Sequence, residues 1–169
     1  MIKFLTDLID IIRLRKGPQD LPVSWPLVIL VIALNIALGV FLSQQVSAEA
    51  PGEAPGLRST VADSALQILL VSVVLNLRNV FNRLPQTLLA MSAAGLLLAI
   101  PLLLLLPYAA QPYTSPVEAL AALGVMAVFV WSFAVDGHIF RHALSVTMAT
   151  GVALAIGLFL IRSIAITFI

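Results

Sequence analysis

The sequence predicts an all-α, polytopic membrane protein: a bundle of five transmembrane helices preceded by an amphipathic, interfacial helix. Three observations predict this fold class. Of the 169 residues, 61% are apolar and only 10% are charged, whereas soluble domains are about 45–50% apolar and about 25% charged. The mean hydropathy is +1.10. The apolar residues also form separate runs, most of them long enough to cross a hydrocarbon core of about 30 Å.

The first 16 residues have the period of an amphipathic helix. One face is apolar and the other is charged, the latter through Lys3, Asp7, Asp10 and Arg13. Gly17 and Pro18 predict the end of this helix, so residues 1–22 form one helix and a Gly-Pro linker. Two placements stay open. The helix lies in the membrane interface, or it packs on the cytoplasmic ends of the bundle.

Residues 23–169 form the transmembrane domain, and its first helix is expected at 25–43. Trp25 at its start is typical of the aromatic belt at a membrane surface. Pro26 suits the first turn of a helix. Residues 44–60 contain the tetrapeptide EAPG twice in tandem, and this density of proline and glycine predicts a loop.

The second helix is expected at 61–81, although charged residues interrupt its apolar run. Only Ser64 to Leu77 lie between Asp63 and Arg78. Thr60 and Asp63 have the spacing of a capping box. The Arg78 side chain can reach the membrane surface, which allows the helix to continue beyond it.

The remaining helices are expected at 86–107, 116–135 and 140–161. Pro101 should kink the third, because proline removes a backbone hydrogen bond and clashes with the preceding turn. Ser115, Pro116 and Glu118 mark the start of the fourth. Arg162, at the end of the fifth, is expected to extend to the far membrane surface.

The basic residues predict the orientation. Five crossings place seven of the nine on one side, namely Lys3, Arg13, Arg15, Lys16, Arg78, Arg83 and Arg141, and leave Arg58 and Arg162 on the other. Basic residues concentrate in cytoplasmic loops. The N-terminus is therefore expected in the cytoplasm and the C-terminus in the periplasm of a bacterial inner membrane.

Asp136, His138, Arg141 and His142 form the densest polar cluster, between the expected fourth and fifth helices. Two histidines four residues apart can share a metal ion, with Asp136 as a third ligand. They can also relay protons. The simpler interpretation, which we prefer, is a short cytoplasmic turn. No metal or other cofactor is therefore predicted.

Two further patterns predict helix packing. Asn35 and Asn76 lie within apolar runs, where an amide seeks a hydrogen bond to a neighbouring helix. Small residues recur at every fourth position in Ser145, Ala149, Ala153 and Gly157, and a second row comprises Thr147, Gly151 and Ala155. Such rows let helices approach closely. We expect packing within the chain, with an oligomer as the alternative.

The stretch RLRKGPQDLP, residues 13–22, resembles the opening of small inner-membrane proteins of proteobacteria. The five-helix layout with a cytoplasmic N-terminus also resembles the Yip1-domain superfamily. That resemblance implies a protein that organises membranes or binds partners rather than an enzyme. The long polar N-terminal region of eukaryotic Yip1 proteins is missing, and the resemblance transfers no functional residues.

Three functions follow from the sequence, in decreasing order of preference. The first is a non-catalytic scaffold, assembly factor or small subunit of a larger complex, in contact with membrane lipids and with other membrane proteins or copies of itself. The second is a transporter or channel component, and the third is a metalloprotein built on Asp136, His138 and His142. The chain has no cysteine, P-loop or GxSxG motif. It also lacks the interleaved basic and aromatic residues that bind nucleic acid.

Overall fold

The computed structural model describes residues 2–47, 56–109 and 115–168, and these residues form an all-α bundle. The elements in order are α1 (Ile2–Ile12), η1 (Pro18–Asp20), α2 (Trp25–Ser47), α3 (Leu57–Leu77), η2 (Phe81–Arg83), α4 (Leu84–Ala109), α5 (Pro116–Leu144) and α6 (Met148–Ile166). Helices α2 to α6 are each long and apolar enough to cross a membrane. The chain is therefore a multi-pass membrane protein with five spans.

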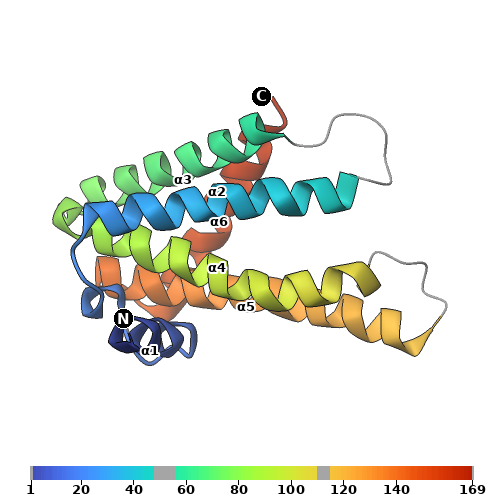
Figure 1. Cartoon of the computed structure of the whole chain (residues 1–169). Coiled ribbons are helices and arrows are strands. Elements are labelled where there is room, and N and C mark those ends of the chain that lie inside the picture. The colour runs from blue at the N-terminus through green and yellow to red at the C-terminus, as the bar shows by residue number, and fades with distance from the viewer. Residues whose placement is uncertain (1, 48–55, 110–114, 169) are drawn as a thin grey trace.

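Helix α4 is the central element of the bundle. It packs against α2 on one side and α5 on the other, while α6 covers α5 and reaches α3. Figure 1 shows α6 running obliquely behind the other helices, from the end of α5 towards the start of α3. The first turns of α4 are almost completely buried, including Leu88 and Leu89. The core therefore lies at the end of the bundle where α4 begins.

Helix α1 packs on this same end of the bundle. Leu8 and Ile11 are buried in the core, and α1 contacts α4 and α5. The indole of Trp131 donates a hydrogen bond to the carbonyl oxygen of Ile12 at 3.2 Å. Leu5 and Ile9 remain exposed on another face of the helix. The sequence left two placements of this helix open, and the structure shows the one in which it packs against the bundle.

Helix α1 ends at Ile12, one turn earlier than the sequence indicated. Leu14 adopts a positive φ of 60°, and the backbone N–H of Arg15 donates to the carbonyl of Asp10 at 2.8 Å. This left-handed residue closes the helix before Gly17 is reached. Lys16 then folds back and pairs with Asp7 at 2.7 Å and with Asp10 at 3.3 Å.

Helix α3 begins and ends four residues earlier than expected, at 57–77 rather than 61–81. Its N-cap is Gly56, so the expected capping box of Thr60 and Asp63 is wrong, and both residues lie inside the helix. Asn79, with φ 56°, turns the chain into η2. Part of the expected 44–60 loop is helical, and residues 48–55 lie outside the described ranges.

The largest correction concerns the end of α5, which continues to Leu144 rather than stopping at 135. Asp136 to His142 are therefore helical, and the expected turn at this cluster is wrong. The chain turns instead at Ser145, whose φ is 55°. Thr147 then caps α6 by accepting a hydrogen bond from the backbone N–H of Thr150. Helix α6 consequently starts at Met148 and not at 140.

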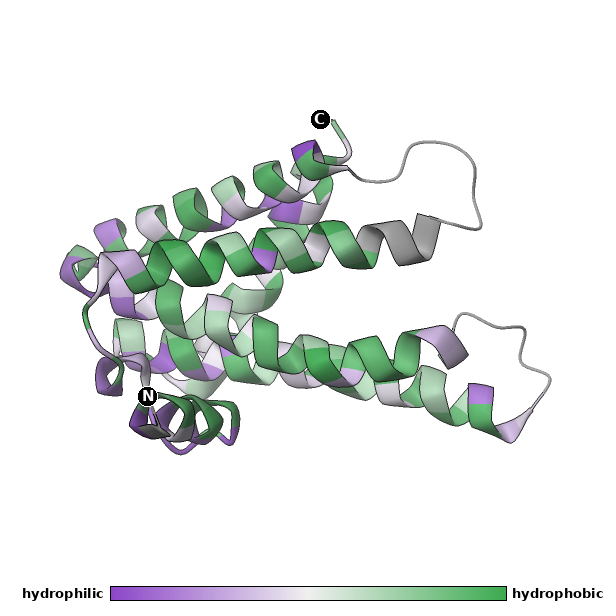
Figure 2. Ribbon diagram, in the orientation of Figure 1, coloured by the Kyte–Doolittle hydropathy of each residue, from purple (hydrophilic) through white to green (hydrophobic). Residues whose placement is uncertain are grey.

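Three connections meet at one end of the bundle, as five alternating crossings require. Arg83, from the α3–α4 connection, donates hydrogen bonds to the carbonyl oxygens of His142 and Ala143 at the end of α5, at 3.1 and 2.9 Å. Gln86 donates to the carbonyl of Leu21 in the N-terminal segment at 2.8 Å. Hydrophilic residues gather at this end, while the middle of α2, α4 and α5 is hydrophobic (Figure 2).

Candidate functional site

The contact between α5 and α6 is made by glycine backbones. A Cβ atom on Gly151 would overlap the carbonyl oxygen of Gly137 and would lie 3.1 Å from the backbone nitrogen of Arg141. A Cβ atom on Gly137 would lie 2.8 Å from the backbone nitrogen of Val152. Gly151 and Ala155 are buried. Gly151 and Ala155 of the second small-residue row therefore pack α6 against α5, whereas Thr147, the third member, is the exposed N-cap of α6.

The first small-residue row faces outward. Ala149 and Ala153 are exposed, and a Cβ atom on Gly157 would meet no atom within 4 Å. Ser145, the fourth member, lies in the turn before the helix and not in α6. The expectation that this row packs within the chain is therefore wrong, because the α5 contact uses the other face of α6.

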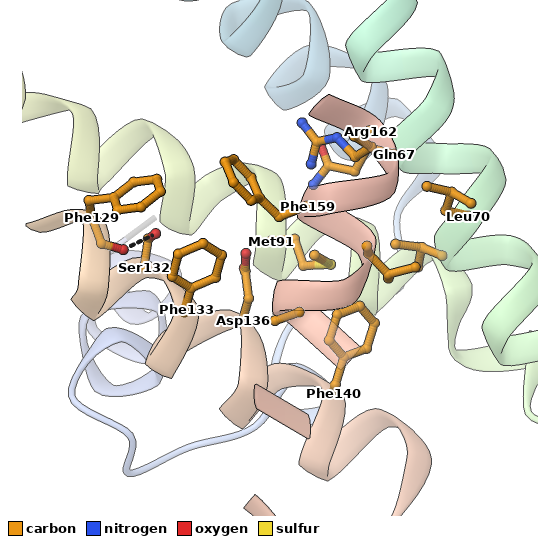
Figure 3. A pocket seen from close by; sticks show the side chains of 13 residues that line it. Gln67, Leu70, Met91, Phe129, Ser132, Phe133, Asp136, Phe140, Phe159 and Arg162 are labelled. Carbon is orange, nitrogen blue, oxygen red and sulfur yellow. Dashed lines mark hydrogen bonds between the residues drawn. The ribbon is translucent and has the colours of Figure 1, made fainter. Parts of the chain in front are cut away.

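A cavity of about 130 Å³ lies among α3, α4, α5 and α6 (Figure 3). Its polar lining comes from Gln67, Ser132, Asp136 and Arg162, and its apolar lining includes Met91 and four phenylalanines, Phe129, Phe133, Phe140 and Phe159. Gln67 is the middle residue of α3. The cavity therefore lies near half the depth of that membrane span.

Three of the phenylalanines hold the α5 wall of the cavity against α6. Phe129 and Phe133 are one turn apart on α5, with ring centroids 4.9 Å apart, and Phe159 of α6 contacts both, at 5.6 and 5.3 Å. All three pairs are edge-to-face, the arrangement that aromatic quadrupoles favour. This cluster gives the cavity an apolar wall beside Asp136.

Asp136 comes from α5, eight residues before its end at Leu144, a distance of about 12 Å along the helix. Its carboxyl group points into the cavity, towards the space beside Phe159 and Met91 (Figure 3). Within the described ranges, this carboxyl group has no hydrogen bond or ion pair. Asp136 thus places a carboxyl group from a membrane helix in a largely apolar cavity.

Arg162 and Asp63 form an ion pair between α6 and α3. The Nε atom of Arg162 donates to Oδ1 of Asp63 at 2.9 Å, and its second nitrogen contacts Oδ2, so the pair is bidentate. The two side chains are 23% and 33% exposed. The sequence predicted that Arg162 extends to the far membrane surface, and the structure adds that a carboxylate on the neighbouring helix holds its side chain.

The proposed metal ligands do not converge. The rings of His138 and His142 lie edge-to-face with centroids 4.6 Å apart, and Nε2 of His138 lies 2.9 Å from the carbonyl oxygen of Lys16. Asp136, two residues before His138, lies on a different face of α5 and lines the cavity. Among the described residues, no group of three histidines, aspartates or glutamates could hold a metal ion.

The two intramembrane asparagines have different surroundings. The Asn35 side chain donates to the carbonyl oxygen of Ser92 on α4, which links α2 to the central helix. Asn76 is exposed in the last turn of α3. Neither asparagine lines the cavity described above.

A second cavity, of about 260 Å³, lies at the end of the bundle where η1, the start of α4 and the end of α5 meet. Arg83, Gln86 and His142 line it. Arg83 and Gln86 already donate hydrogen bonds to backbone carbonyls there. The side chains of this cavity therefore hold the connections of the bundle together.

Sequence reasoning missed the joint site of Asp63, Gln67 and Arg162 with Asp136. Asp63 and Arg162 were each treated as the flank of a membrane span. The sequence did contain a signal for this site. With five crossings, Asp63 and Arg162 lie towards the same membrane surface and carry opposite charges, and charged residues within membrane helices tend to pair.

Comparison with protein families, with curated proteins and with solved structures gives no match for this chain.

Proposed function

We propose that this multi-pass membrane protein acts without catalysis, as a scaffold, an assembly factor or a small subunit of a larger membrane complex. The observation that carries the proposal is the outward row of α6, formed by Ala149, Ala153 and Gly157. Between membrane helices, the lipid removes the hydrophobic drive for association, and close backbone packing takes its place. A row of small residues open to the bilayer is suited to receive another helix.

The opposite face of the same helix supports this proposal. There, Gly151 lets the α5 backbone approach so closely that no Cβ atom would fit. Helix α6 therefore has one surface of small residues that packs within the chain and a second that is open to a partner. The partner is another membrane protein or a second copy of this chain. Membrane lipids cover the remaining exposed apolar faces.

The proposal includes an orientation and a location. The N-terminus is cytoplasmic and the C-terminus periplasmic, in a bacterial inner membrane. The distribution of basic residues supports this orientation. The layout resemblance to the Yip1-domain superfamily supports a role in partner binding or membrane organisation. Because Leu5 and Ile9 of α1 are exposed beside the bundle, we also propose that α1 lies in the membrane interface with these side chains in lipid.

The test is purification at native expression in mild detergent, followed by mass spectrometry of the wild type, Ala153→Leu and Ala127→Leu. Ala127 is an exposed alanine on α5, so the control introduces the same side chain on another lipid-facing surface. We expect a partner at fixed ratio, or a second copy, that is lost from Ala153→Leu and retained by Ala127→Leu. A wild-type chain that purifies alone as a monomer, or equal retention by both variants, would contradict the proposal.

A further inference from the structure

The ionisable side chains at the cavity among α3, α4, α5 and α6, counted together with the Asp63 partner of Arg162, do not balance in charge. The Arg162 guanidinium is bound by Asp63, whose Oδ1 atom lies 2.9 Å from Nε. Asp136 faces the same cavity with no such partner among the described residues. With all three groups ionised, two carboxylates face one guanidinium, and the site carries one unbalanced negative charge.

The side chains nearest the Asp136 carboxyl group offer little solvation for this charge. The carboxyl group points into a space lined by Met91, Phe133 and Phe159 (Figure 3). Of the polar neighbours, Ser132 donates its hydroxyl hydrogen to the carbonyl of Phe129 at 2.7 Å. An ionised carboxylate in such a setting is strongly disfavoured unless it is paired, and uptake of a proton removes the charge.

A proton fits the site better than a metal cation does. A hard cation needs six or more oxygen ligands at close range, and the cavity offers the Asp136 carboxyl group, the Gln67 amide oxygen and the Ser132 hydroxyl. The Arg162 guanidinium lines the same cavity and repels a cation. A proton requires only one carboxyl oxygen. The cavity volume of about 130 Å³ leaves room for several waters, one of which can accept the proton.

We propose that Asp136 binds a proton in the membrane, and that its loss draws Arg162 from Asp63 on α3 towards Asp136 on α5. In the protonated state, Asp136 is neutral and Arg162 stays with Asp63, as the structure has it. When the proton passes to water, two carboxylates compete for one guanidinium. The site therefore couples one proton to an exchange of partners between two helices, and this inference goes beyond partner binding.

The charged groups that face Asp136 are few. Arg162 lines the cavity from α6, and Asp63 on α3 pairs with it. Helix α4 contributes Met91 to the cavity lining, and this side chain does not titrate. On α5 itself, His138 is directed away from the cavity and contacts the Lys16 carbonyl. The titration of the site therefore depends on Asp136 together with the Asp63–Arg162 pair.

The test is an infrared pH titration of the full chain in liposomes, which distinguishes protonated from ionised carboxyl groups. Asp136→Asn should lose one titrating carboxyl per chain. Asp136→Glu should keep the number of titrating carboxyls and move the band to that of glutamate. Asp20→Asn, at an exposed carboxylate of η1, should leave the Asp136 signal unchanged. An Asp136→Asn titration identical to that of the wild type would overturn the proposal, as would a wild-type titration that shifts when sodium replaces choline.

The exchange of Arg162 has a separate readout. Asp63→Asn frees Arg162 to pair with Asp136, so the midpoint of the Asp136 band should move to lower pH by about one unit or more. An unchanged midpoint would show that Arg162 does not move between the two carboxylates. The Asp136→Glu variant keeps the proposal testable should Asp136→Asn fail to fold.

Discussion

The contact between α5 and α6 predicts opposite effects for the same substitution at two glycines of one helix. Gly→Ala in a helix interior gains about 0.8–1.0 kcal/mol through backbone propensity. At Gly157, the added methyl group meets no atom within 4 Å, so this gain is the whole expected effect. At Gly151, the methyl group would overlap the carbonyl oxygen of Gly137, and a backbone atom cannot rotate aside. The two helices must therefore separate.

The size of the difference follows from the same geometry. Overpacking a close contact costs about 1–3 kcal/mol, and the propensity gain is common to both variants. The free energy of unfolding of Gly151→Ala should therefore be about 1–3 kcal/mol below that of Gly157→Ala. The assay is reversible unfolding of both variants in mixed micelles by increasing SDS, followed by circular dichroism. If Gly151→Ala proved as stable as Gly157→Ala, the close approach of α5 and α6 would be refuted.

Three further predictions concern the polar contacts. Asn35→Leu should lower the free energy of unfolding by about 0.6–2 kcal/mol, because it removes the hydrogen bond to α4. The same change at the exposed asparagine in the last turn of α3 should cost less in the same assay. Below the pH at which Asp136 loses its proton, Asp63→Asn should destabilise the fold more than the double variant with Arg162→Gln, since the single change then leaves the Arg162 charge unpaired; a double-variant loss equal to the sum of the two single losses would exclude coupling. Hydrogen bonds that the Lys16 ammonium donates to the two aspartates of α1, chiefly the one to Asp7, raise the pKa of Lys16 above its usual 10.5. The resulting stabilisation is complete below pH 10.5 and is lost as pH rises through the raised pKa. The Trp131 fluorescence, with the other tryptophan replaced by phenylalanine, should therefore report loosening of the end of α1 that it contacts, at high pH in the wild type and at neutral pH in Lys16→Gln. Emission that is insensitive to both changes would argue against the docking of α1.

Several features of the protein follow from local sequence. The number of spans depends on apolar length alone, because every backbone polar group in lipid must be satisfied within its own helix. The start of α5 at Pro116 also follows from local chemistry, with Ser115 as N-cap and the Glu118 carboxylate accepting from its backbone N–H at 2.9 Å. The presence of rows of small residues along α6 likewise follows from the sequence.

The end of α5 could not be found in this way. Asp136, His138 and His142 look like a turn because they are polar, yet tertiary contacts accommodate each of them in a helix. His138 meets the Lys16 carbonyl, and Asp136 faces a cavity. With 29 residues, α5 is about 44 Å long, longer than a hydrocarbon core of about 30 Å. Local polarity therefore did not mark the end of this helix.

By itself, the sequence determined that the chain is helical, that it crosses a membrane five times and that α6 carries two rows of small residues. These properties depend on composition and on periods within single segments. Only the tertiary structure decided which row faces α5, that Arg162 pairs with Asp63, and that Asp136 lines the same cavity as Arg162. Asp63 and Arg162 are 99 positions apart in the chain. Which side chains meet across helices depends on how each helix is rotated and tilted, and no pattern within one segment specifies that.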